Sequence, residues 1–124
     1  MKKEMTNAEI YGLAKALSSA FNMDERYLPA RVNFFISKNK NTISQLADII
    51  EDSRLDIIKH YGTITPDGNV IIPEEQIQKA NAELVDLLNL SHEIEISMLP
   101  LSALNDLEFT PAQMQALLFM IEED

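Results

Sequence analysis

Apolar residues recur every three or four positions in four separate stretches of the chain, which predicts four amphipathic helices. The first stretch follows a capping sequence that starts at Thr6, and the stretch ends near Phe21. Residues 22–28 have no such period and are interpreted as a connection. The second covers residues 29–61 and stops before Gly62. The third begins at residue 73, and its apolar stripe consists of Ile77, Ala80, Leu84, Leu87 and Leu88. The fourth follows another capping position at Thr110.

The predicted helix at residues 29–61 is long for a chain of 124 residues, because it would span about 50 Å against a compact diameter of roughly 35 Å. Poor helix formers at 39–42 mark a point where it could kink or break. One face carries a heptad-like row, the long-helix stripe, made of Val32, Ile36, Asn39, Ile43, Leu46, Ile50, Ser53 and Ile57.

Two readings of the long-helix stripe stay open. It is either part of an ordinary core within one chain or the interface of a dimer or higher oligomer. Asn39 and Ser53 interrupt the apolar row, and buried polar residues at such positions can fix register or oligomeric state. On the second reading, all eight residues of the stripe are interface candidates.

Two short stretches change to a period of two, which is typical of strands. Residues 62–72 surround an Asp67-Gly68 pair and predict a β-hairpin. Residues 92–98 predict one further strand, which could add to the hairpin as its third strand. We therefore predict a single domain over residues 1–124, mainly α with a small antiparallel β element (α+β), with about four helices, one of them long.

Charge is distributed unevenly. Residues 1–62 carry nine Lys or Arg and eight Asp or Glu, a balance of +1, whereas residues 63–124 carry Lys79 against twelve acids, a balance of −11. The net charge of −10 makes direct nucleic-acid binding and binding to anionic membranes unfavourable. The longest apolar runs have three residues, too few to span a membrane. The basic residues within 1–4 are not followed by the apolar segment of a signal peptide, so we expect a cytoplasmic protein.

Candidate chemistry is sparse. The chain has no cysteine, three glycines and two histidines, and it contains no phosphate-binding loop or catalytic triad motif. The carboxylates of Asp48, Glu51, Asp52 and Asp56 share a helix face, which we interpret as solvated rather than as a metal site. We expect no enzyme and no catalytic, cofactor-binding or metal-binding residues.

Three basic residues, Arg31, Lys38 and Lys40, fall in the first half of the long helix. They are candidates for contacting an anion, either a phosphate-bearing ligand or the acidic half of a neighbouring copy. The alternative is an ordinary solvated helix face.

An ordered series of motifs resembles a group of uncharacterised small proteins encoded in phages and prophages of Gram-positive and gut bacteria, and the resemblance covers about residues 7–122. The series is L-P-A-R-V-x-F at 28–34, K-H-Y-G at 59–62, D-G-x-V-x-I-P at 67–73, A-E-L-V-D-L-L at 82–88, E-I-E-I at 93–96 and T-P-x-Q-M-x-A-L at 110–117. The resemblance implies a viral origin and a compact, partly helical fold. It implies no activity and no functional residues.

These observations favour a non-enzymatic phage or prophage accessory or assembly protein that acts through protein–protein contact and self-associates. It would work in the cytoplasm of the bacterial host, with association with the virion as an option. A second hypothesis is a viral inhibitor of a host defence or nucleic-acid-processing protein, which would use its acidic half in place of phosphates. A third is an oligomeric binder of a small anionic ligand.

Overall fold

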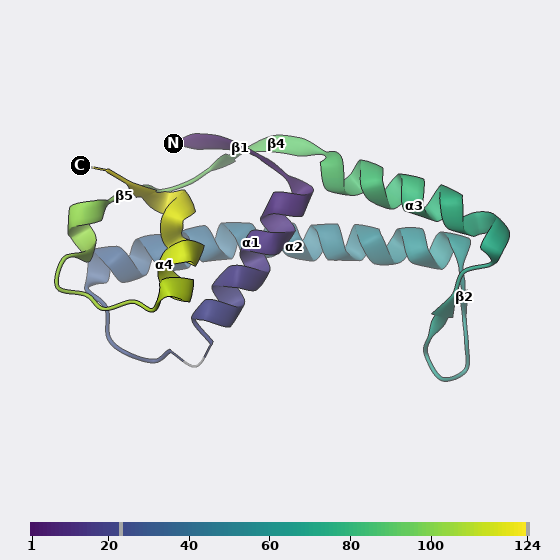
Figure 1. The fold of residues 1–124 in the computed structure, drawn as a ribbon, viewed down its shortest axis with the longest axis horizontal. Coiled ribbons are helices and arrows are strands. Elements are labelled where there is room, and N and C mark those ends of the chain that lie inside the picture. Colours follow the sequence, from purple (N-terminus) through teal and green to yellow (C-terminus); the bar gives the residue numbers. More distant parts are fainter. Residues whose placement is uncertain (23, 124) are drawn as a thin grey trace.

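The long helix forms without a break as α2, Ala30–Tyr61, in a computed structural model that describes residues 1–22 and 24–123 (Figure 1). Its 32 residues span about 48 Å. Residue 23, part of a connection predicted at 22–28, lies outside the described residues.

The helix continues through its weak point at 39–42 because the polar side chains there are engaged. The amide of Asn39 bonds the backbone of Ser97, and the hydroxyl of Thr42 donates to the carbonyl of Lys38 at 3.1 Å. The Thr42 bond lies within the helix, so it is the tertiary contact of Asn39 with Ser97 that offsets the low helix propensity of this segment.

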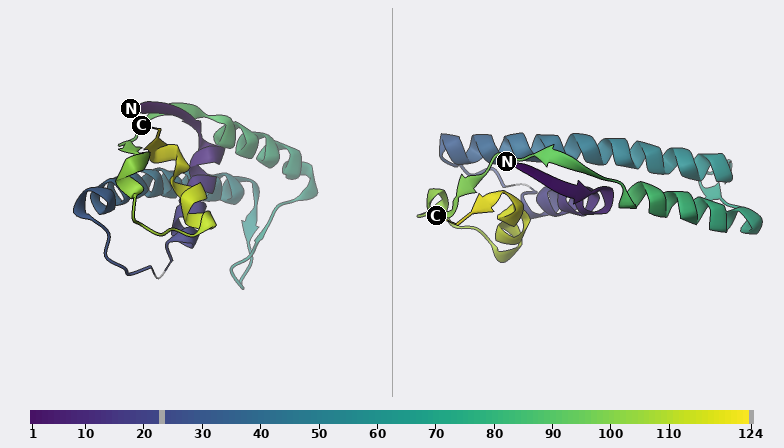
Figure 2. Two further views of the ribbon diagram at one scale, coloured as in Figure 1. Left: turned by 60° about the vertical axis from the view of Figure 1, so that its left-hand side comes forward. Right: turned by 90° about the horizontal axis from the view of Figure 1, so that it is seen from above.

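Two helices pack along α2. Helix α1, Asn7–Ala20, crosses its middle, and α3, Glu74–Asn89, lies antiparallel to its C-terminal half (Figures 1 and 2). Thr6 begins α1 with the predicted capping box, in which its hydroxyl accepts from the amide of Glu9 at 3.1 Å. Both helices confirm the predicted positions.

The remaining helices lie at the other end of α2. Helix α4, Pro111–Leu117, begins with the second predicted capping box at Thr110 and passes into a 3₁₀ turn, Leu118–Met120. A further 3₁₀ turn, Leu101–Leu104, precedes it. The core gathers here, among Ile10, Leu17, Ile43, Ile96, Leu99, Leu117 and Met120, all of them fully buried.

Short β pairs complete the fold. The predicted hairpin is confirmed as β2, Thr63–Ile64, and β3, Val70–Ile71, with Gly68 in the turn at φ +88°. The predicted further strand forms as β4, Ser91–Glu95. A parallel pair, β5, Leu99–Pro100, with β6, Ile121–Glu122, was not predicted.

The option that β4 extends the hairpin is wrong. Strand β4 pairs instead with β1, Lys2–Thr6, in antiparallel register. Strand β4 and the hairpin lie at opposite ends of α3, whose 16 residues span about 24 Å. Overall, the described residues form a mainly α protein with short β elements, and none of their helices is both long and apolar enough to cross a membrane.

Candidate interaction surface

The long-helix stripe is covered mostly by the chain itself. Five of its eight residues, Val32, Ile36, Asn39, Ile43 and Ile50, are buried in the core, and Leu46, Ser53 and Ile57 are half-buried. Helices α1 and α3 pack against α2, and the buried apolar residues of the stripe belong to one core with residues of β4 and α4. The first reading, an ordinary core within one chain, therefore accounts for the five buried residues, while an interface role for Leu46, Ser53 and Ile57 stays a prediction.

Asn39 has an intramolecular role in this structure. Only 1% of the residue is exposed, and its side-chain amide bonds both backbone groups of Ser97. The Nδ2 group donates to the Ser97 carbonyl at 2.8 Å, and Oδ1 accepts from the Ser97 amide at 2.9 Å. The hypothesis that this residue sets oligomeric state is replaced by one in which it holds the segment after β4 against α2.

Beyond α1 the molecule is only two helices thick. We call this part the arm: the end of α2 from residue 51, the hairpin and α3 (Figures 1 and 2). An isolated pair of helices has no third layer to cover apolar residues beside its contact line.

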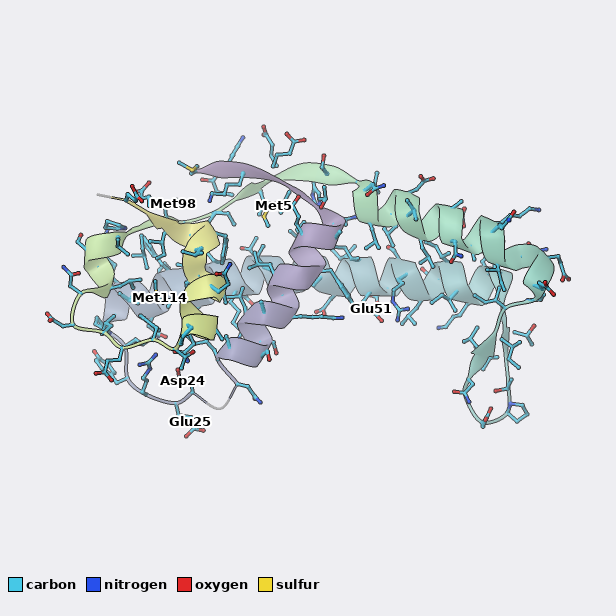
Figure 3. The ribbon with its side chains drawn as sticks, in the orientation of Figure 1. Met5, Asp24, Glu25, Glu51, Met98 and Met114 are labelled. Atoms are coloured by element: carbon cyan, nitrogen blue, oxygen red, sulfur yellow. The ribbon has the colours of Figure 1, made fainter. Side chains whose placement is uncertain are left out.

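On α2, the uncovered face of the arm continues the face that α1 covers. Glu51 accepts a hydrogen bond from the hydroxyl of Tyr11 in α1 at 2.8 Å, so it marks the side on which α1 lies (Figure 3). Leu55 and Ile58 follow on this side at four- and three-residue steps. Leu55 is exposed and Ile58 is half-buried, because α1 does not reach them.

On α3, Ala80 faces α2 and is buried, while a wider apolar row lies to one side of it. Leu88 of this row packs against the core, which places the row on the side where the core lies. Val85 and Ile77 are exposed by 54% and 41%. We call the combined surface the arm face: Leu55, Ile58, Ile77, Asn81, Leu84 and Val85.

Most charged side chains of α3 lie elsewhere on the helix, and only Glu74, in its first turn, falls on the side of the arm face. At about 100° per residue, Glu75, Lys79, Glu83 and Asp86 fall on the side of α3 away from the arm face. The hairpin adds exposed apolar residues at the tip of the arm, Ile64, Val70 and Ile71. The arm face is therefore an apolar surface on an otherwise acidic half of the chain.

A polar cluster joins α1 to α2 at the base of the arm. Arg54 donates to Glu51 through Nε at 2.9 Å and Nη2 at 2.7 Å. These bonds, with that from Tyr11, lower the pKa of Glu51 from its usual value to about 2. The bond to Glu51 raises the pKa of Tyr11. Proton transfer at neutral pH requires groups whose pKa values lie near 7. Here the pKa of the carboxyl group is lowered and the pKa of the phenol is raised, so both values move away from 7.

This cluster predicts a pH dependence of stability. The depressed pKa of Glu51 adds stability that is fully present above about pH 5 and is lost as pH falls towards 2. Glu51→Gln should therefore lose less stability than the wild type in urea unfolding between pH 5 and pH 2. Asp52→Asn, one residue away and exposed, is the control and should follow the wild type. Equal pH slopes for wild type and Glu51→Gln would contradict the role of this cluster.

Of the three anion-contact candidates, Arg31 and Lys38 share a face of α2 on either side of Phe35, and Lys40 lies apart from them. Arg31 lies over the ring of Phe35, with 5.6 Å from its guanidinium carbon to the ring centre. Lys38 borders a shallow cavity that also contains Glu95 and Glu122. Lys40 lies two residues, or about 200°, further round α2. The carboxylates beside Lys38 weaken its attraction for a free anion.

Both histidines have neighbours that account for them. His60 packs edge-on against Tyr61 with ring centres 4.7 Å apart. His92 Nε2 lies 2.9 Å from Oδ1 of Asn7, whose Nδ2 donates to the carbonyl of Leu87 at 2.8 Å. Within the described residues, no three His, Asp or Glu side chains are arranged to hold a metal ion.

The arm face was missed at the level of sequence, although a signal for it was present. The apolar stripe predicted on the third helix included Ile77 and Leu84, and it was wider than a single partner helix can cover. Val85 was not part of that prediction.

Comparisons of the chain with models of protein families, with curated proteins and with solved structures find no match. What the chain does is therefore inferred from its own residues.

Proposed function

We propose that this chain is a non-enzymatic accessory or assembly protein of a phage or prophage and that it acts by protein–protein contact. It self-associates through the arm face in the cytoplasm of the bacterial host, and association with the virion is one setting for this. The observation that carries the proposal is the two-helix arm, whose apolar face is left uncovered by the rest of the chain.

The size of the arm sets the expected strength of this contact. Helix α3 is about 24 Å long, and two helices side by side are about 20 Å wide, so two arm faces would bury about 1,000 Å² in total. This area is at the lower limit for specific interfaces. Self-association should therefore be weak and should depend on protein concentration.

Electrostatics predicts how salt acts on the dimer. Each copy carries a net charge of −10, so two copies repel each other, while the contact itself is apolar. Salt screens the repulsion and leaves the apolar contact in place. Raising the NaCl concentration from about 0.05 M to 0.5 M should shorten the Debye length from about 14 Å to about 4 Å. The dimer should therefore become stronger.

Light scattering over a range of protein and salt concentrations tests the proposal. The average mass should rise from 14.0 kDa towards twice that value with increasing concentration, and it should rise earlier at high salt. A mass of one chain under all conditions, up to about 1 mM, would exclude even a weak dimer and with it this function.

One observation favours a second candidate function. Glu4 and Glu93 lie opposite each other in the β1–β4 register and form an acidic pair on the outer face of this sheet, whereas Glu95 beside them lies opposite Lys2 and pairs with the Met1 ammonium at 3.1 Å. An inhibitor of a nucleic-acid-processing protein would use such a face in place of phosphates. Its binding to a basic target should weaken steeply with salt, opposite to the salt effect on the arm contact.

A further inference from the structure

Strand β4 has one free edge. Its first neighbour, β1, is hydrogen-bonded to the even-numbered residues: the Ile96 amide donates to the Met1 carbonyl at 2.8 Å, and the Met1 ammonium donates to the Ile96 carbonyl at 3.0 Å. Because antiparallel pairs alternate, the backbone groups of Glu93 and Glu95 point away from β1. Among the described residues, no hydrogen-bond partner lies against these groups.

Ser97, the next odd-numbered residue, shows what kind of hydrogen-bond partner this edge binds. Ser97 has its amide and carbonyl bonded by the side-chain amide of Asn39, at 2.9 Å and 2.8 Å. A primary amide in this position supplies one donor and one acceptor, as the backbone of a neighbouring strand would. The chain thus covers its own edge at residue 97 and leaves it open at 93 and 95.

A groove follows the open edge. One cavity of about 300 Å³ lies between β4 and the side of α2 that carries Thr42, Gln45 and Leu46. A second, of about 380 Å³, continues it to the end of α3 at Leu87 and Leu90. The two cavities share residues, and their lining is mainly apolar. We call this the edge groove, and both of its parts include Leu46, Ile49 and His92.

Charge indicates which partner fits. The side chains of Glu93 and Glu95 project from the sheet face opposite to buried Ile94, and they border the open edge. Glu95 already pairs with the Met1 ammonium at 3.1 Å, so Glu93 contributes most to the negative charge at this edge. A second copy of β4 added at this edge would place carboxylates beside carboxylates, which is unfavourable for directly opposed residues. A basic strand would instead be complementary.

We infer that the edge groove binds an extended segment of another protein in which Lys or Arg residues alternate with apolar residues. The segment adds to β4 as a third strand. Its apolar side chains contact Leu46 and Ile49, of which Ile49 is 61% exposed, and its basic side chains lie beside Glu93 and Glu95. This site is separate from the arm face, because Ile49 and Ile58 are half a turn apart around α2.

A seven-residue peptide of alternating lysine and valine, labelled for fluorescence anisotropy, is the probe. It should bind saturably, and a peptide with glutamate in place of lysine should bind at least ten-fold more weakly. Ile49→Asp, which places a charge in the groove, should weaken binding of the lysine peptide at least ten-fold. Leu55→Asp makes the same kind of change on the arm face and should leave binding unchanged, whatever it does to the dimer.

The edge itself is tested by Glu93→Pro. The proline removes an amide that faces the open edge and leaves the bonds to β1 intact, so it should weaken peptide binding at least ten-fold. Hydrogen exchange on the wild type gives the same test without a variant: the Glu93 and Glu95 amides should exchange fast in the free protein and slowly with peptide bound. No binding, binding insensitive to Ile49→Asp, or unchanged exchange at both amides would overturn the inference.

Discussion

Asn39→Ala is expected to lower the free energy of unfolding by about 3 kcal/mol and the melting temperature by roughly 10 °C. The substitution removes both hydrogen bonds to Ser97 and leaves that residue's amide and carbonyl without their partner in a half-buried position. It also removes most of the volume of a side chain that is 1% exposed. Urea and thermal unfolding measure the two quantities.

The matched control for this prediction is Asn41→Ala. Asn41 lies on the same helix two residues later and is exposed, so its loss should change stability by less than about 0.5 kcal/mol. Asn39→Leu restores side-chain volume but not the two hydrogen bonds, and it should remain clearly destabilised while its mass in solution follows that of the wild type. An Asn39→Ala protein as stable as Asn41→Ala would show that the bonds to Ser97 contribute little.

Val85→Glu should abolish self-association at concentrations where the wild type is dimeric, with a loss of affinity of at least 30-fold, or about 2 kcal/mol. The reason is that pairing of the arm faces would bury a new carboxylate in an apolar contact on both copies. Because Val85 is 54% exposed in the single chain, the melting temperature of the monomer should barely change. Sedimentation equilibrium measures the dissociation constant.

Lys79→Glu is the control for that substitution. It makes the chain more negative than Val85→Glu does, but on the side of α3 away from the arm face. It should therefore weaken the dimer far less, and high salt should restore most of the loss. Equal effects of the two variants would mean that overall charge, and not the arm face, controls association.

The helices and the hairpin could be predicted because their signals are local. Thr6 and Thr110 each begin a helix with a capping box, and the Asp67-Gly68 turn joins two strands that are neighbours in sequence. Each of these features depends on residues within one or two turns of chain. Their positions in the structure are close to those predicted.

Features that depend on distant parts of the chain were not predicted. Strand β1 begins with Lys2 and Lys3 and has no alternating pattern of its own, and it forms because β4, about 90 residues later, offers a pairing edge. Likewise, the stripe on α2 showed which face is apolar, but not that the chain itself would cover it. Asn39 was recognised as unusual, yet its partner Ser97 is 58 residues away.

Cross-linking at the midpoint of α3 tests the central claim most directly. The chain has no cysteine, and Asn81 lies on the arm face near the middle of α3. A two-fold pairing in which α3 packs on α3 about an axis near the middle of the helix brings the two copies of residue 81 close together, and this is the pairing that we expect. At concentrations where light scattering shows dimer, Asn81→Cys should be joined by a short bis-maleimide, whereas Lys79→Cys, on the other side of α3, should not. Equal cross-linking of both variants, or none at residue 81, would contradict the account.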